Sequence, residues 1–117
     1  MLERRRSICK QHGTGPLCAD GERWLPVPRY AGWYEASCCG GVYSMPRAAT
    51  AGGLLAPQLN SRGYRVVMLS RYGRVLTVTV GSVVLLAFRG PPPRPGMRAR
   101  HGSLGKQDDS LGNLRWG

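Results

Sequence analysis

Apolar and polar residues alternate most clearly in the middle of the chain, over residues 64–80. Two alternating segments, residues 64–69 and 74–80, flank the tetrapeptide Ser70-Arg71-Tyr72-Gly73. A period of two places the apolar side chains on one face of a strand, and a short glycine-containing link joins antiparallel strands. The pattern therefore predicts a β-hairpin.

An unbroken apolar segment, residues 83–88, follows this hairpin. Ser82 precedes it, and Gly90 and Pro91 follow it. Serine is a favourable helix N-cap and a helix stops before proline, so we expect a short helix ending before Gly90, although a longer strand fits the same pattern. The wider apolar stretch contains polar residues and is shorter than the roughly 20 residues of a membrane span, so no span is predicted.

The flanking segments carry weaker patterns. Residues 1–20 are basic and lack apolar periodicity, which predicts a flexible arm. Residues 22–46 combine aromatics with Pro and Gly, which predicts short strands and turns in which Trp24, Trp33 and Tyr34 pack as a small core. Further predicted elements are a strand at 54–59, an extended proline-rich connector at 91–96, a strand at 97–101 and a short helix at 109–114.

The charge of the chain indicates the class of its binding partner. The 117 residues hold 17 Lys and Arg against 6 Asp and Glu, a formal net charge of +11. No acidic residue lies between Glu35 and Asp108, whereas ten basic residues lie from Arg47 to Lys106. Such a field attracts a polyanion, so nucleic acid is the first partner to consider.

The four cysteines form no C-x-x-C pair, and we interpret them as reduced thiols of an intracellular protein. A zinc site from Cys9, His12 and Cys18 is an alternative, but its spacing is irregular and a fourth ligand is not evident.

Several separated segments, taken in order, resemble phage and intron-encoded HNH homing endonucleases. Residues 22–28 (ERWLPVP), 32–37 (GWYEAS) and 41–44 (GVYS) are similar to the nuclease-associated modular DNA-binding motif that precedes HNH domains. Residues 59–66 (LNSRGYRV) and 86–88 (LAF) resemble the segments that follow it, and residues 101–102 and 109–116 (DSLGNLRW) resemble the ββα-metal motif.

The resemblance implies an α+β fold in which a small β-rich module, with a hairpin and a short helix, precedes a ββα-metal (HNH) finger. The expected divisions are the basic arm at 1–20, the modular DNA-binding motif at 21–50, and an HNH domain at 54–117 with the finger at 97–117. The implied partner is double-stranded DNA, and the implied location is the cytoplasm of a bacterial or phage-infected host.

The implied chemistry is metal-dependent hydrolysis of phosphodiester bonds with Mg or Mn. His101 stands at the position of the general base, and Asn113 at a position that supplies a metal ligand. Asp108 and Asp109 are further candidate metal ligands, although Asp109 is equally suited to cap the terminal helix.

Three departures from the family pattern weaken this chemistry. Arg100 replaces an acidic metal ligand just before the base, Ser110 replaces the middle Asn, and Gly81-Ser82 replaces a His-Arg pair. A cation beside a divalent ion is electrostatically unfavourable.

We therefore carry three hypotheses: an HNH endonuclease, a catalytically inactive DNA-binding remnant of one, and an RNA-binding basic protein. For the first two, phosphate contacts are expected from six arginines around the hairpin and the strand before His101. These are Arg62, Arg65, Arg71, Arg74, Arg98 and Arg100.

Overall fold

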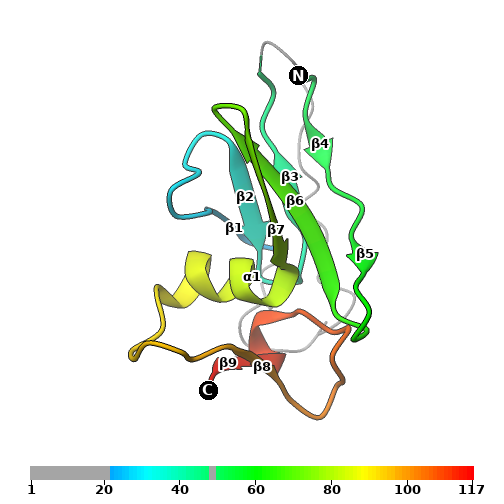
Figure 1. Ribbon diagram of the computed structural model, residues 1–117, viewed down its shortest axis with the longest axis vertical. Helices are drawn as coiled ribbons and strands as arrows, with labels where there is room; N and C mark the ends of the chain where they lie inside the picture. Colours follow the sequence, from blue (N-terminus) through cyan, green and yellow to red (C-terminus); the bar gives the residue numbers. More distant parts are fainter. Residues whose placement is uncertain (1–21, 48–49) are drawn as a thin grey trace.

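The computed structural model describes residues 22–47 and 50–117, so the predicted basic arm and the alternative zinc ligands lie outside the described residues. The elements are β1 (Trp24–Pro26), β2 (Tyr34–Ser37), β3 (Val42–Ser44), β4 (Gly53–Leu54), β5 (Gln58–Leu59), β6 (Arg65–Arg71), β7 (Arg74–Thr79), α1 (Val80–Arg89), β8 (Ala99–His101), the 3-10 helix η2 (Leu111–Asn113) and β9 (Leu114–Trp116). They form three antiparallel sheets, ordered β1-β2-β3-β4, β5-β6-β7 and β8-β9, around α1 (Figure 1).

The first sheet confirms the short strands predicted for residues 22–46. Alternate residues of β2, Tyr34 and Ala36, are buried and pack with Val27 and Val42. The predicted strand at 54–59 is instead two short strands, β4 and β5, which pair in different sheets.

The predicted hairpin is confirmed as β6 and β7. Arg71 pairs with Arg74, and the two residues between them, Tyr72 and Gly73, have φ of 53° and 76°. Positive φ at both turn positions matches the right-handed twist of a two-residue hairpin. Val67 and Leu69 face the core.

The predicted helix is also present, but it begins earlier. Thr79, not Ser82, is its N-cap and accepts a hydrogen bond from the Ser82 backbone N–H at 3.4 Å. The helix ends at Arg89, where Gly90 adopts φ of 76°. Among the described residues, no helix is long and apolar enough to cross a membrane.

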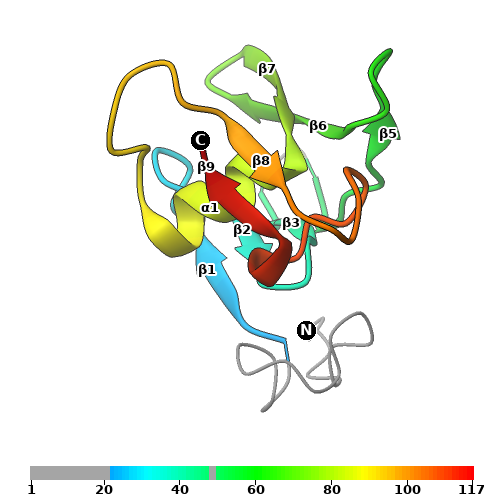
Figure 2. The same cartoon turned by 90° about the horizontal axis from the view of Figure 1, so that it is seen from below.

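The predicted helix at 109–114 is wrong. Residues 111–113 form one 3-10 turn, and Leu114–Trp116 is a strand that pairs with Ala99–His101 beside α1 (Figure 2). Strand pairing takes up backbone groups that a helix would have bonded locally. Of the expected ββα finger, the described residues show the two paired strands and this turn.

One apolar core joins the first and last parts of the described chain. Val27 and Tyr34 from the first sheet belong to the same cluster as Leu85 of α1 and Leu114 of β9. The predicted domain boundaries stay a prediction, but the core residues on either side of them pack together.

The two described cysteines differ in state. Cys38 is a buried cysteine outside any disulfide, whereas Cys39 is disulfide-bonded, so the expectation of reduced thiols is wrong for Cys39. The intracellular location inferred from the thiols therefore stays a prediction.

Candidate functional site

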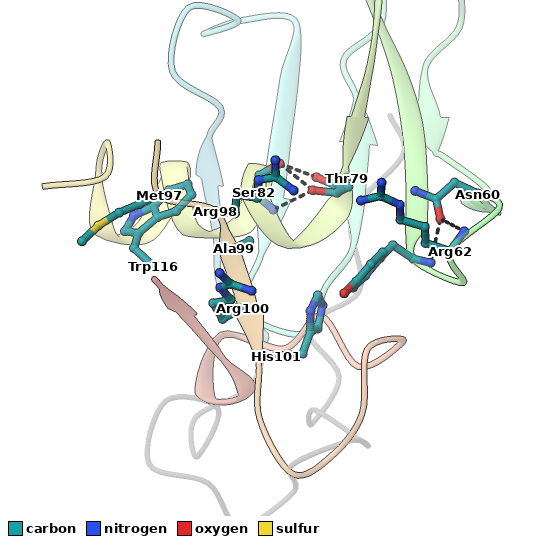
Figure 3. Close-up of a pocket in the computed structure, with 11 residues that line it drawn as sticks. Asn60, Arg62, Thr79, Ser82, Met97, Arg98, Ala99, Arg100, His101 and Trp116 are labelled. Atoms are coloured by element: carbon teal, nitrogen blue, oxygen red, sulfur yellow. Dashed lines mark hydrogen bonds between the residues drawn. The ribbon is translucent and has the colours of Figure 1, made fainter. Parts of the chain in front are cut away.

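A groove of about 360 Å³ lies where the β5–β6 turn, the start of α1 and the β8–β9 hairpin meet. We call it the arginine groove. Its lining comprises Asn60, Arg62 and Tyr64 from the turn, Thr79 and Ser82 from the helix start, and residues 97–101 with Trp116 from the hairpin (Figure 3).

Three of the six arginines predicted to bind DNA line this groove. Arg62, Arg98 and Arg100 are exposed there, and no acidic residue is among the lining residues. Guanidinium groups in a lining that contains no carboxylate create a positive field suited to phosphate groups. Half of the six arginines predicted to contact DNA therefore lie in this groove, and their contact with DNA stays a prediction.

His101 lies at the inner end of the groove in a fixed orientation. Its Nε2 is 2.7 Å from Asp109 Oδ1, and its ring lies 5.4 Å from the Tyr64 ring. An ionised carboxylate only accepts hydrogen bonds, so Nε2 is the donor in this pair. Asp109 therefore selects the imidazole tautomer as well as its orientation.

Asp109 is itself held by Arg65. The Asp109 side chain is buried, and its Oδ2 accepts a hydrogen bond from Arg65 Nη1 at 3.1 Å. Arg65 Nη2 also donates to the Gly40 carbonyl at 3.4 Å. Arg65, expected to contact DNA, is thus engaged inside the protein.

His101 and Asp109 pack closely against the backbone of Gly81. A Cβ added at Gly81 would lie 3.0 Å from Asp109 Oδ1, 3.1 Å from Leu114 Cδ2 and 3.4 Å from His101 Nε2. The first turn of α1 consequently packs against His101 and Asp109 with no room for a side chain.

Asn113 and Asp108 stabilise the loop between β8 and β9. The Asn113 amide donates to the carbonyls of Gly105 and Asp108 at 3.0 and 2.9 Å, and its oxygen accepts from the Leu104 N–H at 3.2 Å. Asp108 Oδ1 accepts from the backbone N–H and the hydroxyl of Ser110. Both side chains thus bond groups of the loop itself.

Comparison with known proteins gives two matches over this region. The NUMOD4 motif matches residues 22–70. A solved structure described as "DNA binding and cleavage by the HNH homing endonuclease I-HmuI" matches with a TM-score of 0.70 and 28% identity over 81% of this chain. The chain thus carries a NUMOD4 motif and is similar in structure to an HNH homing endonuclease.

The match has defined limits. The chain spans about half of the solved protein, 52% of that protein's length. A search of curated proteins gave no match. The sequence resemblance to the family and to its modular motif is confirmed, whereas the roles of individual residues stay predictions.

The predicted metal ligands in the described part of the chain do not fit a divalent metal. No group of three or more His, Cys, Asp and Glu there is arranged to hold an ion. The predicted ligands are engaged elsewhere: Asp109 with His101 and Arg65, Asp108 with Ser110, and Asn113 with the loop backbone. The arrangement does not favour the predicted metal roles of these three residues.

The remaining two predicted DNA contacts, Arg71 and Arg74, lie at the tip of the β6–β7 hairpin, away from the groove (Figure 1). The Arg71 guanidinium lies 5.2 Å from both the Tyr30 and the Tyr72 ring centroids. Arg74 is exposed. They form a cationic position separate from the arginine groove.

Sequence reasoning missed Tyr64, which lines the groove, and Lys106, which lies beside Tyr64. Lys106 Nζ donates to the Arg62 carbonyl at 2.7 Å and lies 5.3 Å from the Tyr64 ring, which in turn contacts His101. The isolated Lys in a loop and the Tyr in a predicted strand carry no local signal for this contact, because it depends on how the β8–β9 loop folds back.

Proposed function

We propose that this protein binds double-stranded DNA through the arginine groove. The observation that carries the proposal is the position of Arg62, Arg98 and Arg100 along one groove without an acidic neighbour in its lining. Guanidinium groups bind phosphate oxygens in a bidentate manner, and most protein–DNA hydrogen bonds go to the backbone.

Two further observations support DNA as the partner. The net charge of +11 attracts a polyanion over the whole molecule. The solved structure is described as showing DNA binding and cleavage, and the match covers 81% of this chain.

The binding test compares two triple variants with the same loss of charge. Arg62, Arg98 and Arg100 are changed to Gln in one, and the exposed Arg29, Arg89 and Arg94, outside the groove lining, are changed to Gln in the control. We expect the groove variant to bind a fluorescent duplex at least about tenfold more weakly than the control, since three hydrogen bonds at about 0.5 kcal/mol each amount to about 1.5 kcal/mol. Equal affinity of the two variants would exclude the groove as the binding site.

A competition experiment distinguishes a preference for DNA from a preference for RNA. Unlabelled duplex DNA should displace the labelled duplex at a lower concentration than a structured RNA hairpin of equal length does. The reverse order would favour the RNA-binding hypothesis, which explains the charge but not the family match.

A second candidate function is phosphodiester cleavage with His101 as general base. Asp109 occupies Nε2 and leaves Nδ1 as the ring nitrogen for proton transfer. Metal-dependent cleavage with Mg or Mn would then need ligands beyond those that the described residues offer.

A plasmid assay distinguishes the two functions. Supercoiled plasmid is incubated with the protein in the presence and absence of Mg²⁺ or Mn²⁺, beside His101→Ala from an identical preparation. The DNA-binding proposal expects no nicking above the level of the variant. Metal-dependent nicking that is lost in His101→Ala would establish the endonuclease instead.

A further inference from the structure

The buried Asp109 carboxylate is the electrostatic centre of the region that resembles a ββα-metal site. Its residue is 1% exposed, and a buried carboxylate is strongly destabilising unless it is paired and hydrogen-bonded. Both oxygens have partners, Oδ1 with His101 and Oδ2 with Arg65.

Arg65 supplies the positive charge in this arrangement. Its guanidinium bridges Asp109 and the Gly40 carbonyl, so it is held from both sides. Arg65 lies in β6, within the NUMOD4 match, whereas Asp109 lies in the loop between β8 and β9. The ion pair therefore joins two parts of the chain that are 44 positions apart.

A divalent cation at the same carboxylate would face two obstacles. It would compete with Arg65 and His101 for oxygens already engaged at 3.1 and 2.7 Å. It would also stand beside a fixed guanidinium, and like charges at such distances repel strongly where water is excluded. The contacts made by Asp108 and Asn113 within the loop provide no compensating ligands.

We propose that Arg65 is an internal cation that takes the charge-balancing place of a divalent metal at Asp109, making the Arg65–Asp109–His101 centre metal-independent. Gly81 contributes to this centre, because its lack of a side chain lets the start of α1 approach Asp109 and His101. The positive end of the helix dipole adds to the stabilisation of the carboxylate. The proposal concerns this centre alone and does not depend on whether the groove binds DNA.

The first test is direct and uses the unmodified chain. Mn²⁺ is added in substoichiometric amounts to isotopically labelled protein, and paramagnetic broadening of NMR signals is followed residue by residue. We expect the signals of His101, Asp109 and Gly81 to broaden no more than those of exposed residues at the hairpin tip. Selective broadening at these three residues, abolished by Asp109→Asn, would overturn the proposal.

The second test measures the internal cation through thermal unfolding. Arg65→Gln leaves a buried carboxylate without its counter-charge, and we expect Tm to fall by roughly 10 °C. Arg62→Gln, an exposed arginine near the same turn, is the matched control and should leave Tm nearly unchanged. Equal effects of the two substitutions would overturn the proposal.

A double substitution separates charge balance from packing. In Arg65→Gln combined with Asp109→Asn both charges are gone, so we expect Tm to recover above that of Arg65→Gln alone, and Arg65→Lys to lose less than Arg65→Gln. Additive losses in the double variant would show that the two charges are not coupled. If Arg65→Gln does not fold, the Mn²⁺ experiment on the unmodified protein still tests whether the centre binds a metal.

Discussion

At the scale of single residues, Asn113 closes the β8–β9 loop through three hydrogen bonds. Asn113→Ala leaves these backbone groups without that partner, so we predict a fall of about 2–3 kcal/mol in the free energy of unfolding, measured by urea denaturation. Gln58→Ala, at an exposed edge-strand amide, is the control and should change the stability by less than about 0.5 kcal/mol. Unchanged stability of Asn113→Ala together with weakened Mn²⁺ binding would instead make Asn113 a metal ligand.

Gly81 shows how one absent side chain sets the position of α1. Glycine inside a helix is ordinarily less stable than alanine by about 1 kcal/mol. The added Cβ of Gly81→Ala would press on Asp109 and Leu114 at 3.0 and 3.1 Å, so we predict the opposite sign, a loss of about 1–3 kcal/mol.

The control for this substitution is Gly112→Ala, where an added Cβ meets nothing within 4 Å. Both variants are compared by urea denaturation under identical conditions. A more stable Gly81→Ala would mean that the loop carrying Asp109 moves away from the helix at little energetic penalty.

At the scale of elements, the first two sheets are tied together by Tyr34. Its hydroxyl accepts from the Ser70 N–H at 2.9 Å and donates to the Ser70 carbonyl at 3.3 Å, joining β2 to β6. We predict that Tyr34→Phe lowers the free energy of unfolding by about 1–3 kcal/mol and speeds amide exchange at Ser70. Tyr30→Phe is the matched control, and equal effects of the two would deny the hydroxyl this role.

The elements that could be predicted from sequence are those with local patterns. The β6–β7 hairpin follows from alternation beside Tyr72-Gly73, and α1 follows from its apolar run between glycine residues. The predicted helix at 109–114 was wrong because Leu114–Trp116 pairs with a strand about fifteen positions earlier. No local sequence pattern indicates that pairing.

The candidate site was predictable to a similar degree. The family resemblance and the charge pattern pointed to His101 and to three arginines that line one groove, and their roles stay predictions. Arg65 was predicted to contact DNA, and its pairing with Asp109 could not be foreseen, because Asp109 lies 44 positions away and approaches only in the folded chain. Neither the periodicity nor the composition of a sequence predicts an ion pair between residues so far apart in the chain.

At the scale of the whole molecule, α1 contacts strands of all three sheets, so the described chain should unfold as one unit. Leu85 is fully buried in this helix. We predict that Leu85→Ala lowers the free energy of unfolding by about 2–5 kcal/mol and accelerates amide exchange in β2 and β8 alike. Leu76→Ala, at an exposed leucine, is the control; faster exchange confined to one sheet would indicate separately folding domains.

The salt dependence of DNA binding tests whether the groove or the diffuse charge of the molecule holds the duplex. Each phosphate neutralised by the protein contributes about 0.9 to the slope of log K against log salt concentration. We predict that the groove variant of Arg62, Arg98 and Arg100 reduces this slope by about 2.7, since three phosphate contacts at about 0.9 each are lost. The control variant of Arg29, Arg89 and Arg94 removes the same charge and should leave the slope almost unchanged, because long-range fields are screened within about 10 Å at 0.1 M salt. Equal reductions in the two variants would show that the net charge of +11, and not the groove, determines the interaction with DNA.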